Sequence, residues 1–391
     1  MRVHLYTGSL DLVRRSGVGQ AVAHQRAMLE SAGVEVVESW ALPADAVHIN
    51  TVLPDAPLAA WRARLRGERV VVYGHSTMED FRNSFVGSNR LAPLFKQWLR
   101  LCYNRGDVVL TPTPYARNIL DGYGLRPPVQ VLSNGVDTDF FAPDPARRAE
   151  FRRRYGLGDG EKAVVSAGHF MQRKGILSFI RLARALPAVR FFWFGYTQPA
   201  LVPADIRQAM AEAPANLTFP GFVSQAELRD AYCGADLFCF CSHEETEGIV
   251  VLEALGCGVP VLVRDIPVYE GWLTHGETVY KARSEADWPA LAAGILDGTL
   301  PDLTAAGRRV AEARSLTRLG RQLCEVYRRL DRAAPHPRPA PRGGWCGSNA
   351  PAPAGKPTGL PGGGGHCFVG RLLAAGAFFG GRRAQTQRPK R

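Results

Sequence analysis

Short apolar runs alternate with segments of helical periodicity along most of the chain, and this alternation restricts the fold more than any other feature. The runs "RVVVY" and "DVVLT", for example, flank a segment near 90–104 whose apolar residues recur at helical spacing. Strands that alternate with helices predict parallel sheets covered by helices on both faces. The series restarts at "AVVSAG" after a stretch rich in Pro and Asp, 137–148, so we expect two Rossmann-like α/β domains.

The expected organisation has four parts. Residues 1–142 would form the first Rossmann-like domain and residues 143–314 the second. A helix over 315–332 is expected to cross back onto the first domain. Residues 333–391 are rich in Pro, Gly and Ala without periodicity, a composition that predicts a disordered, low-complexity tail.

The net charge of +12 does not predict a nucleic-acid partner for the folded part. Residues 333–391 carry nine Lys or Arg and no acidic residue, so most of the excess charge belongs to the tail. The N-terminus lacks the apolar segment of a secretory signal, and no apolar run reaches the ~18 residues of a membrane-spanning helix. We therefore expect a cytoplasmic protein. The spacing of Cys239, Cys241 and His243 does not suit a structural zinc site, so we expect no metal there.

The segment "HEETEGIVVLEALG", 243–256, concentrates acidic residues where a strand should end and a helix should begin. Open α/β sheets bind ligands at this edge, and a helix N-terminus offers free N–H groups to a phosphate. Acidic residues also stabilise a helix N-terminus without a ligand, by ~0.3–1 kcal/mol each. We expect Glu244 and Glu247 to form such a solvated rim. Glu253 lies in an apolar context and needs a partner, which ligand hydroxyls could supply.

Glu245 and Glu253 are eight residues apart, and this spacing resembles the E-x7-E motif of retaining glycosyltransferases of family GT4. The resemblance implies the GT-B architecture, in which two Rossmann-like domains face each other across a donor cleft. It also implies that Glu245 contacts the donor sugar and that Glu253 binds the ribose hydroxyls. The backbone of Gly248, Ile249 and Val250 would then hold the diphosphate of the donor.

Three further segments resemble the same family. "SGVG" is similar to its first Gly-rich loop, which implies that Gly17 and Gly19 approach the donor. "YGHST" places His75 after a strand, where the family has a His near the sugar and the acceptor. The resemblance assigns His75, Glu245 and Lys174 to the catalytic site.

The segment "RKG" is similar to the family's phosphate-binding turn, and the resemblance makes Lys174 the phosphate-binding lysine. The family's usual Arg, five residues before that lysine, is His169 here. Arg173 is the candidate that would compensate for this change. The departure also leaves open a sugar-nucleotide-binding protein without turnover.

The resemblance is greatest to bacterial glycolipid synthases that add an α-1,2-linked sugar to α-glucosyl-diacylglycerol, and it covers about 1–331. It rests on segments such as "HSTMEDFRNSF" and "EETEGIVVLEAL". It implies UDP-glucose or UDP-galactose as donor, a glycolipid acceptor, no metal or other cofactor, and a peripheral position on the inner face of the cell membrane. A glycosyltransferase with a soluble or cell-wall acceptor remains an alternative. A dehydrogenase is disfavoured because Val22 stands where a full G-x-G-x-x-G needs glycine.

The segment "RLAPLFKQWLRLCYNR", 90–105, mixes basic and apolar residues. A basic helix with aromatic side chains suits an anionic membrane surface. A helix packed on the core with a solvated basic edge would show the same pattern, and the residues alone do not separate the two. The candidate membrane and acceptor residues are Arg90, Lys96, Trp98, Arg100 and Arg105.

Overall fold

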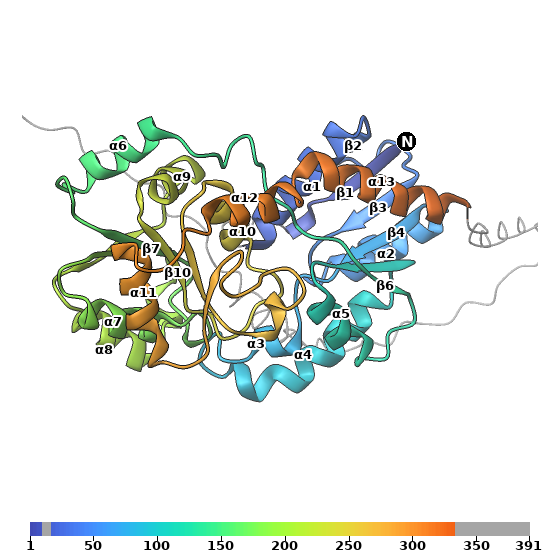
Figure 1. The fold of residues 1–391 in the computed structure, drawn as a ribbon. Coiled ribbons are helices and arrows are strands. Elements are labelled where there is room, and N and C mark those ends of the chain that lie inside the picture. The colour runs from blue at the N-terminus through green and yellow to red at the C-terminus, as the bar shows by residue number, and fades with distance from the viewer. Residues whose placement is uncertain (10–16, 333–391) are drawn as a thin grey trace, which may run out of the picture.

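The computed structural model describes residues 1–9 and 17–332, and these residues form two lobes, each built around one sheet (Figure 1). Both sheets have six strands, and every strand pair is parallel. The prediction of two parallel α/β sheets is therefore confirmed. The predicted disordered tail, 333–391, and Ser16 of the Gly-rich loop lie outside the described residues.

The first sheet has the strand order β2-β1-β3-β4-β5-β6. Its strands are β1 (Arg2–Tyr6), β2 (Glu35–Val37), β3 (Ala46–Ile49), β4 (Arg69–Tyr73), β5 (Val108–Thr111) and β6 (Val129–Val131). The helices of this lobe are α1 (Gly17–Ser31), α2 (Ala56–Leu65), α3 (Met78–Phe81), α4 (Ser88–Tyr103) and α5 (Pro114–Asp121).

The second sheet has the order β12-β11-β10-β7-β8-β9. Its strands are β7 (Ala163–Ala167), β8 (Arg190–Phe194), β9 (Leu217–Gly221), β10 (Leu237–Phe240), β11 (Val261–Arg264) and β12 (Tyr280–Ala282). The helices that follow β6 are α6 (Pro145–Arg154), α7 (Ile176–Ala185), α8 (Ala204–Ala211), α9 (Gln225–Gly234), α10 (Ile249–Gly256), α11 (Asp287–Asp297), α12 (Thr304–Glu312) and α13 (Leu316–Arg332).

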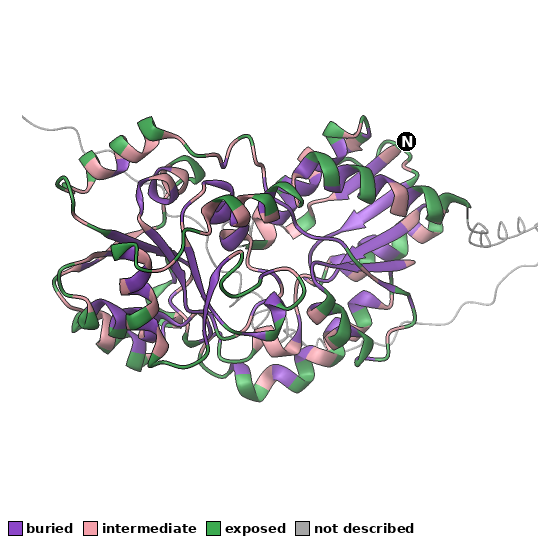
Figure 2. Cartoon of the chain, in the orientation of Figure 1, coloured by how far each residue is buried: buried purple, intermediate pink, exposed green. Residues whose placement is uncertain are grey.

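The central strands β1, β3, β4 and β5 of the first sheet are largely buried, as their apolar runs require, whereas the edge strands β2 and β6 each expose one residue (Figure 2). Successive residues of a strand point to opposite faces, so Val70 and Val72 enter one core layer while Val71 and Tyr73 enter the other. Helices α2, α4 and α5 cover the first layer, and α1 and α13 cover the second. Among the described helices, none combines the length and the apolarity that crossing a bilayer requires.

Helix α13 follows the second lobe in sequence but packs against α1 of the first (Figure 1). The two helices approach so closely at Gly320 that a Cβ atom there would lie 2.2 Å from the backbone oxygen of Met28. The Tyr327 hydroxyl lies 2.5 Å from Nδ1 of His48, a residue of β3, and burial lowers the pKa of His48 to about 3. This neutral contact ties the last described helix to the first sheet.

Gly320→Ala should destabilise the protein, although alanine forms helices better than glycine by about 1 kcal/mol. The added Cβ meets backbone, which cannot rotate away, so α13 must move off α1 at a cost of about 1–3 kcal/mol. Denaturant unfolding measures the change. Arg321→Ala, on the exposed face of the same helix, is the control and should leave the midpoint unchanged. Equal stability of the two variants would contradict the close approach.

Candidate active site

A cleft of about 680 Å³ lies between the two domains, and the carboxyl ends of strands from both sheets open onto it. Each sheet changes strand order at one point, between β1 and β3 in the first and between β7 and β10 in the second. Ligands of open α/β sheets bind at such points. In the second domain the turns after β7 and β10 carry Lys174 and Glu245 into the cleft.

The cleft brings together most of the residues that the sequence predicted for donor binding and catalysis. Those that line it are Gly17, His75, Arg173, Lys174, Glu245, Gly248, Ile249, Val250 and Glu253. Gly19 lies in the first turn of α1 and is not part of the lining. The predicted membrane residues lie on α4 or directly after it, with Trp98 beside the cleft wall, where its indole N–H donates to the Val52 carbonyl at 2.6 Å.

Glu245 and Lys174 form a buried ion pair. The Lys174 ammonium lies 2.5 Å from Oε1 of Glu245, and the Ser242 hydroxyl donates to the same oxygen at 2.7 Å. Burial opposes ionisation of Glu245, but the positive charges of Lys174 and Arg173 outweigh it and lower the pKa of the carboxyl. The pair therefore holds a carboxylate and an ammonium at the carboxyl ends of two adjacent strands.

Arg173 reaches across the cleft to the first domain. Its guanidinium lies 2.8 Å from Oδ1 of Asp80 and donates to the Ser84 hydroxyl at 3.2 Å, and it also donates to the Glu244 carbonyl at 2.9 Å. The same group is 3.8 Å from Oε1 of Glu245. In this structure Arg173 bridges the two domains, so its predicted contact with a donor remains a prediction.

His169, which replaces the expected arginine, also lines the cleft. Its Nδ1 lies 2.8 Å from the Tyr196 carbonyl, and burial, assisted by the charges of Lys174 and Arg173, lowers its pKa. The imidazole is therefore neutral near pH 7 and does not add the positive charge that an arginine would. Lys174 carries correspondingly more of the positive potential on this side of the cleft.

His75 enters the cleft from the end of β4 in the first domain. Its ring stacks on Tyr73 with the centroids 4.1 Å apart, and its Nε2 lies 2.9 Å from Oδ1 of Asn50. Burial is the main cause that lowers its pKa to about 3. The neutral ring has a hydrogen-bond partner on one nitrogen and a set orientation, as a positioned polar group requires.

Glu253 lies on α10, whose N-cap Gly248 has a φ of 87°, a conformation that favours glycine. The first N–H groups of such a helix have no partner within it and lie at the cleft lining through Ile249 and Val250. The Tyr232 hydroxyl donates to Oε2 of Glu253 at 3.0 Å. Burial raises the pKa of Glu253 to about 7, against the opposing effect of that hydrogen bond.

The prediction that Glu247 belongs to a solvated rim was wrong. Its side chain is 1 % exposed and lies against the first domain. One carboxylate oxygen accepts from the Ser133 hydroxyl at 2.5 Å, and the other accepts from the backbone N–H and side-chain amide of Asn134 at 2.9 and 2.8 Å. These partners are more than a hundred residues away, so no local pattern of the sequence signals the contact.

Glu244 was also expected on the rim, and its half-buried side chain accepts from the Tyr115 hydroxyl of the first domain at 2.9 Å. Burial raises the pKa of Glu244 to about 7. Sequence reasoning also missed Asp80, Asn50 and Tyr232, which hold Arg173, His75 and Glu253. Each partner lies on a different element from the residue it holds, so spacing along the chain does not reveal the pairing.

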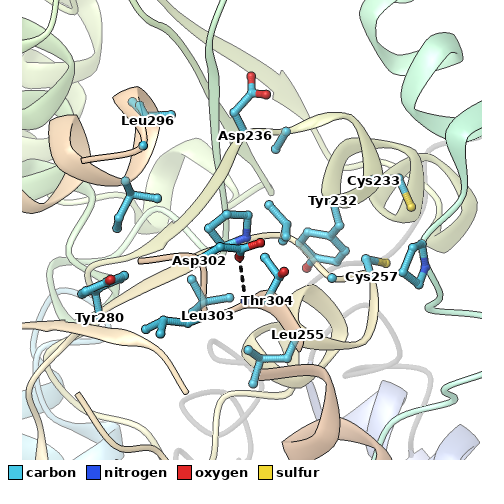
Figure 3. A pocket seen from close by; sticks show the side chains of 18 of the residues that line it. Tyr232, Cys233, Asp236, Leu255, Cys257, Tyr280, Leu296, Asp302, Leu303 and Thr304 are labelled. Atoms are coloured by element: carbon cyan, nitrogen blue, oxygen red, sulfur yellow. Dashed lines mark hydrogen bonds between the residues drawn. The ribbon is translucent and has the colours of Figure 1, made fainter. Parts of the chain in front are cut away.

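A second cavity, of about 860 Å³, lies at the end of the second sheet that faces away from the interdomain cleft (Figure 3). Lys162, Asp236 and Pro260, which directly precede β7, β10 and β11, line it, so it opens at the amino ends of the strands. Polar groups in its wall bond to the protein itself, as when the Thr304 N–H donates to Asp302 at 2.9 Å. This cavity therefore lacks the converging polar groups of the interdomain cleft.

Solved structures with the same arrangement show that the fold is GT-B. Anabaena HepE in complex with UDP-glucose superposes with a TM-score of 0.66 and 16% identity over 84% of this chain and all of that one. The sucrose-phosphate synthase of Thermosynechococcus elongatus gives a TM-score of 0.67 at 17% identity, over 85% of this chain and 100% of the other. At these identities the comparison shows the fold alone.

Residues 16–140 match Glycosyltransferase Family 4, and residues 147–298 match Glycosyl transferases group 1. The processive diacylglycerol alpha-glucosyltransferase of Acholeplasma laidlawii is 35% identical over 331 residues, 84% of this chain and 98% of that protein. The alpha-galactosylglucosyldiacylglycerol synthase of Streptococcus pneumoniae is 28% identical, over 80% and 85% of the two chains. The chain belongs to glycosyltransferase family GT4 and is a retaining hexosyltransferase related to the diacylglycerol glycosyltransferases.

Glu247→Ala should destabilise the interface between the domains. The Ser133 and Asn134 donors would lose their acceptor in a buried position, and an unsatisfied buried donor costs free energy of folding. We expect the midpoint of thermal unfolding to fall by about 5 °C or more, measured by circular dichroism. Glu244→Ala is the matched control and should cause a much smaller change, since its half-buried partner Tyr115 can bond to water. A fall of the same size in both variants would contradict a special role for Glu247.

Proposed function

We propose that this protein transfers glucose or galactose, with retention, from a UDP-sugar to α-glucosyl-diacylglycerol and forms an α-1,2-linked diglycosyl lipid. The observation that carries the proposal is that the Glu245 and Glu253 pair and an apolar wall of the first domain line the same cleft. Two relatives, one named a diacylglycerol alpha-glucosyltransferase and the other an alpha-galactosylglucosyldiacylglycerol synthase, support the choice of a glycolipid acceptor.

The second domain supplies the groups that a UDP-sugar needs. Negative charge grows on the diphosphate as the sugar leaves, and the Lys174 ammonium and the first N–H groups of α10 would stabilise that charge. Glu245, held by Lys174 and Ser242, would accept hydrogen bonds from sugar hydroxyls. Glu253, one turn further along α10, would accept hydrogen bonds from the ribose hydroxyls.

The first domain supplies a wall that suits a lipid acceptor. Val52, Leu53 and three phenylalanines line its side of the cleft. Phe81 packs edge-on to Phe85 with centroids 5.1 Å apart and stacks on Phe95 at 4.2 Å. A soluble sugar acceptor would leave this apolar surface in water, whereas the glycerol and upper acyl chains of a glycolipid would cover it.

The catalytic arrangement follows from these two walls. The acceptor hydroxyl would attack on the face from which the diphosphate leaves, as the family resemblance implies, so no carboxylate serves as nucleophile. Neutral His75 would position the sugar and acceptor hydroxyls from the first domain. The contacts of Arg173 with Asp80 and Ser84 would hold the acceptor wall at a fixed position relative to the donor-binding turn. The two substrates would then be bound in the geometry that the reaction needs, which lowers the entropic part of the barrier.

Helix α4 would bring the enzyme to the inner face of the cell membrane. Arg90 and Arg105 are exposed and form no ion pair with any described residue, which leaves their charges available to anionic lipid headgroups. Lys96 lies 4.5 Å from the centre of the Tyr123 ring, and Arg100 donates to Gln97. Trp98 attaches α4 to the cleft wall through its hydrogen bond to Val52. Membrane binding and support of the acceptor wall would therefore both depend on α4.

The test is a coupled assay of UDP release with the full-length protein, with and without α-glucosyl-diacylglycerol in detergent micelles. We expect release that depends on the lipid, and product analysis with UDP-glucose and UDP-galactose would identify the sugar. Glu245→Gln should reduce turnover by at least about a hundredfold, while circular dichroism should show that the variant is still folded. Release with a soluble sugar alone would contradict the lipid acceptor. Donor binding without release would favour a protein that has lost turnover, as the His169 replacement would allow.

The pH dependence of donor binding should report Glu253. Above its pKa of about 7 the carboxylate accepts hydrogen bonds from ribose hydroxyls, and below that pH it becomes protonated and accepts them less well. The KM for the donor should therefore rise as the pH falls from 8 to 6. Glu253→Gln should show a raised KM without this rise. Glu244→Gln is the control, because Glu244 has a pKa in the same range and should not affect the profile.

A further inference from the structure

Large apolar side chains that are exposed are unevenly distributed over the described residues. Tyr196 and Phe222 of the second domain line the cleft, and the others belong to the first domain. Three of these lie on α2: Leu58, Trp61 and Leu65 are 67 %, 58 % and 48 % exposed. Their spacing of three and four residues places them on one face of the helix, and we refer to them as the α2 ridge.

The α2 ridge and the outer face of α4 point in the same direction. The opposite face of α2, formed by its alanines, packs into the same core layer as Phe95 and Leu99 of α4. The two helices contact each other on one face of the first sheet. On α4, Leu94 and Leu101 are exposed, and the exposed Arg90 and Arg105 flank them along the chain.

The charged residues of the two helices are all basic. Neither 56–67 nor 88–105 contains an acidic residue. At the C-terminal end of α2, Arg64 pairs with Asp107 and Arg66 pairs with Glu68. Arg62 is exposed, and its guanidinium lies 4.6 Å from the centre of the Trp40 ring. The α2 ridge is therefore an apolar row beside uncompensated basic residues.

This combination discriminates among possible partners. A second copy of the chain, docked face to face, would bring these basic residues against one another without an acid between them. A nucleic acid would meet the charges but would leave the leucines and the tryptophan without apolar contacts. An anionic bilayer satisfies both, because Trp and Leu enter its interfacial region while arginines bind the headgroups.

We propose that the α2 ridge inserts into the interface of an anionic bilayer and that the basic residues of α4 bind headgroups beside it. This inference rests on the proposed function and extends it from α4 to a two-helix surface. Helix α2 begins three residues after Leu53 of the apolar cleft wall. Insertion of the ridge would therefore hold the acceptor side of the cleft against the lipid surface, where a glycolipid can enter without leaving the bilayer.

The experiment measures sedimentation of the full-length protein with vesicles of phosphatidylglycerol and phosphatidylcholine, and with vesicles of phosphatidylcholine alone. We expect binding to the anionic vesicles. The variant with Leu58→Ser, Trp61→Ser and Leu65→Ser should bind them at least about tenfold more weakly. Its melting temperature and its turnover in detergent micelles should stay unchanged, because all three side chains are exposed. Val131→Ser, at an exposed apolar residue of β6, is the control and should bind normally.

Quenching by brominated lipids gives a second readout. Anionic brominated vesicles should quench the tryptophan fluorescence of the wild-type protein, and most of this quenching should be absent in Trp61→Phe. Unchanged vesicle binding by the triple variant would overturn the proposal. If the triple variant differs from the wild-type protein in oligomeric state, measured by light scattering, and still binds vesicles normally, the α2 ridge is a contact between copies of the chain. Because binding is measured without turnover, vesicle binding that persists without any glycolipid product would contradict the proposed function and leave the ridge supported.

Discussion

The buried carboxylate of Glu247 joins the two domains beside the cleft that they enclose. Three residues of the turn between β10 and α10 contact the first domain: Glu244 through Tyr115, Thr246 through Thr113, and Glu247 through Ser133 and Asn134. Glu245 lies between them but faces its own domain and pairs with Lys174. The turn expected to hold the donor is thus held by the opposite domain while its central carboxylate stays in the cleft.

Charge is arranged in the cleft so that few ionised groups are left uncompensated. Glu245 pairs with Lys174, and Arg173 pairs with Asp80, whereas His75 and His169 are neutral because desolvation at these partly buried positions lowers the pKa of each ring. A diphosphate entering this cleft would meet the ammonium of Lys174 and the N-terminus of α10. Buried charges are tolerated only with such partners, which explains why the site depends on contacts across both domains.

The sequence could predict that the candidate donor residues lie together at one end of a sheet, because these residues are close in the chain. Lys174 follows a strand by a few residues, and Glu245, Gly248 and Glu253 all belong to one strand–turn–helix unit, so spacing alone brings them to one edge of a sheet. The pairing of Arg173 with Asp80 could not be predicted, since it joins loops of different domains. The amphipathic pattern of 90–105 was visible, but the α2 ridge was not, because "APLAAWRARL" has no marked apolar face and only its packed alanines show which side is buried.

The sequence by itself determined that two parallel α/β sheets follow each other along the chain and that the chain resembles family GT4. These follow from apolar periodicity and from motifs whose parts lie close together in the chain. Only the tertiary structure decided that Glu247 is a buried joint rather than a solvated rim, that Arg173 bridges the domains, and which side chains remain exposed. Hydrogen-bond partners and burial depend on elements that are distant in sequence, so they are defined only once the two domains and α13 have packed together.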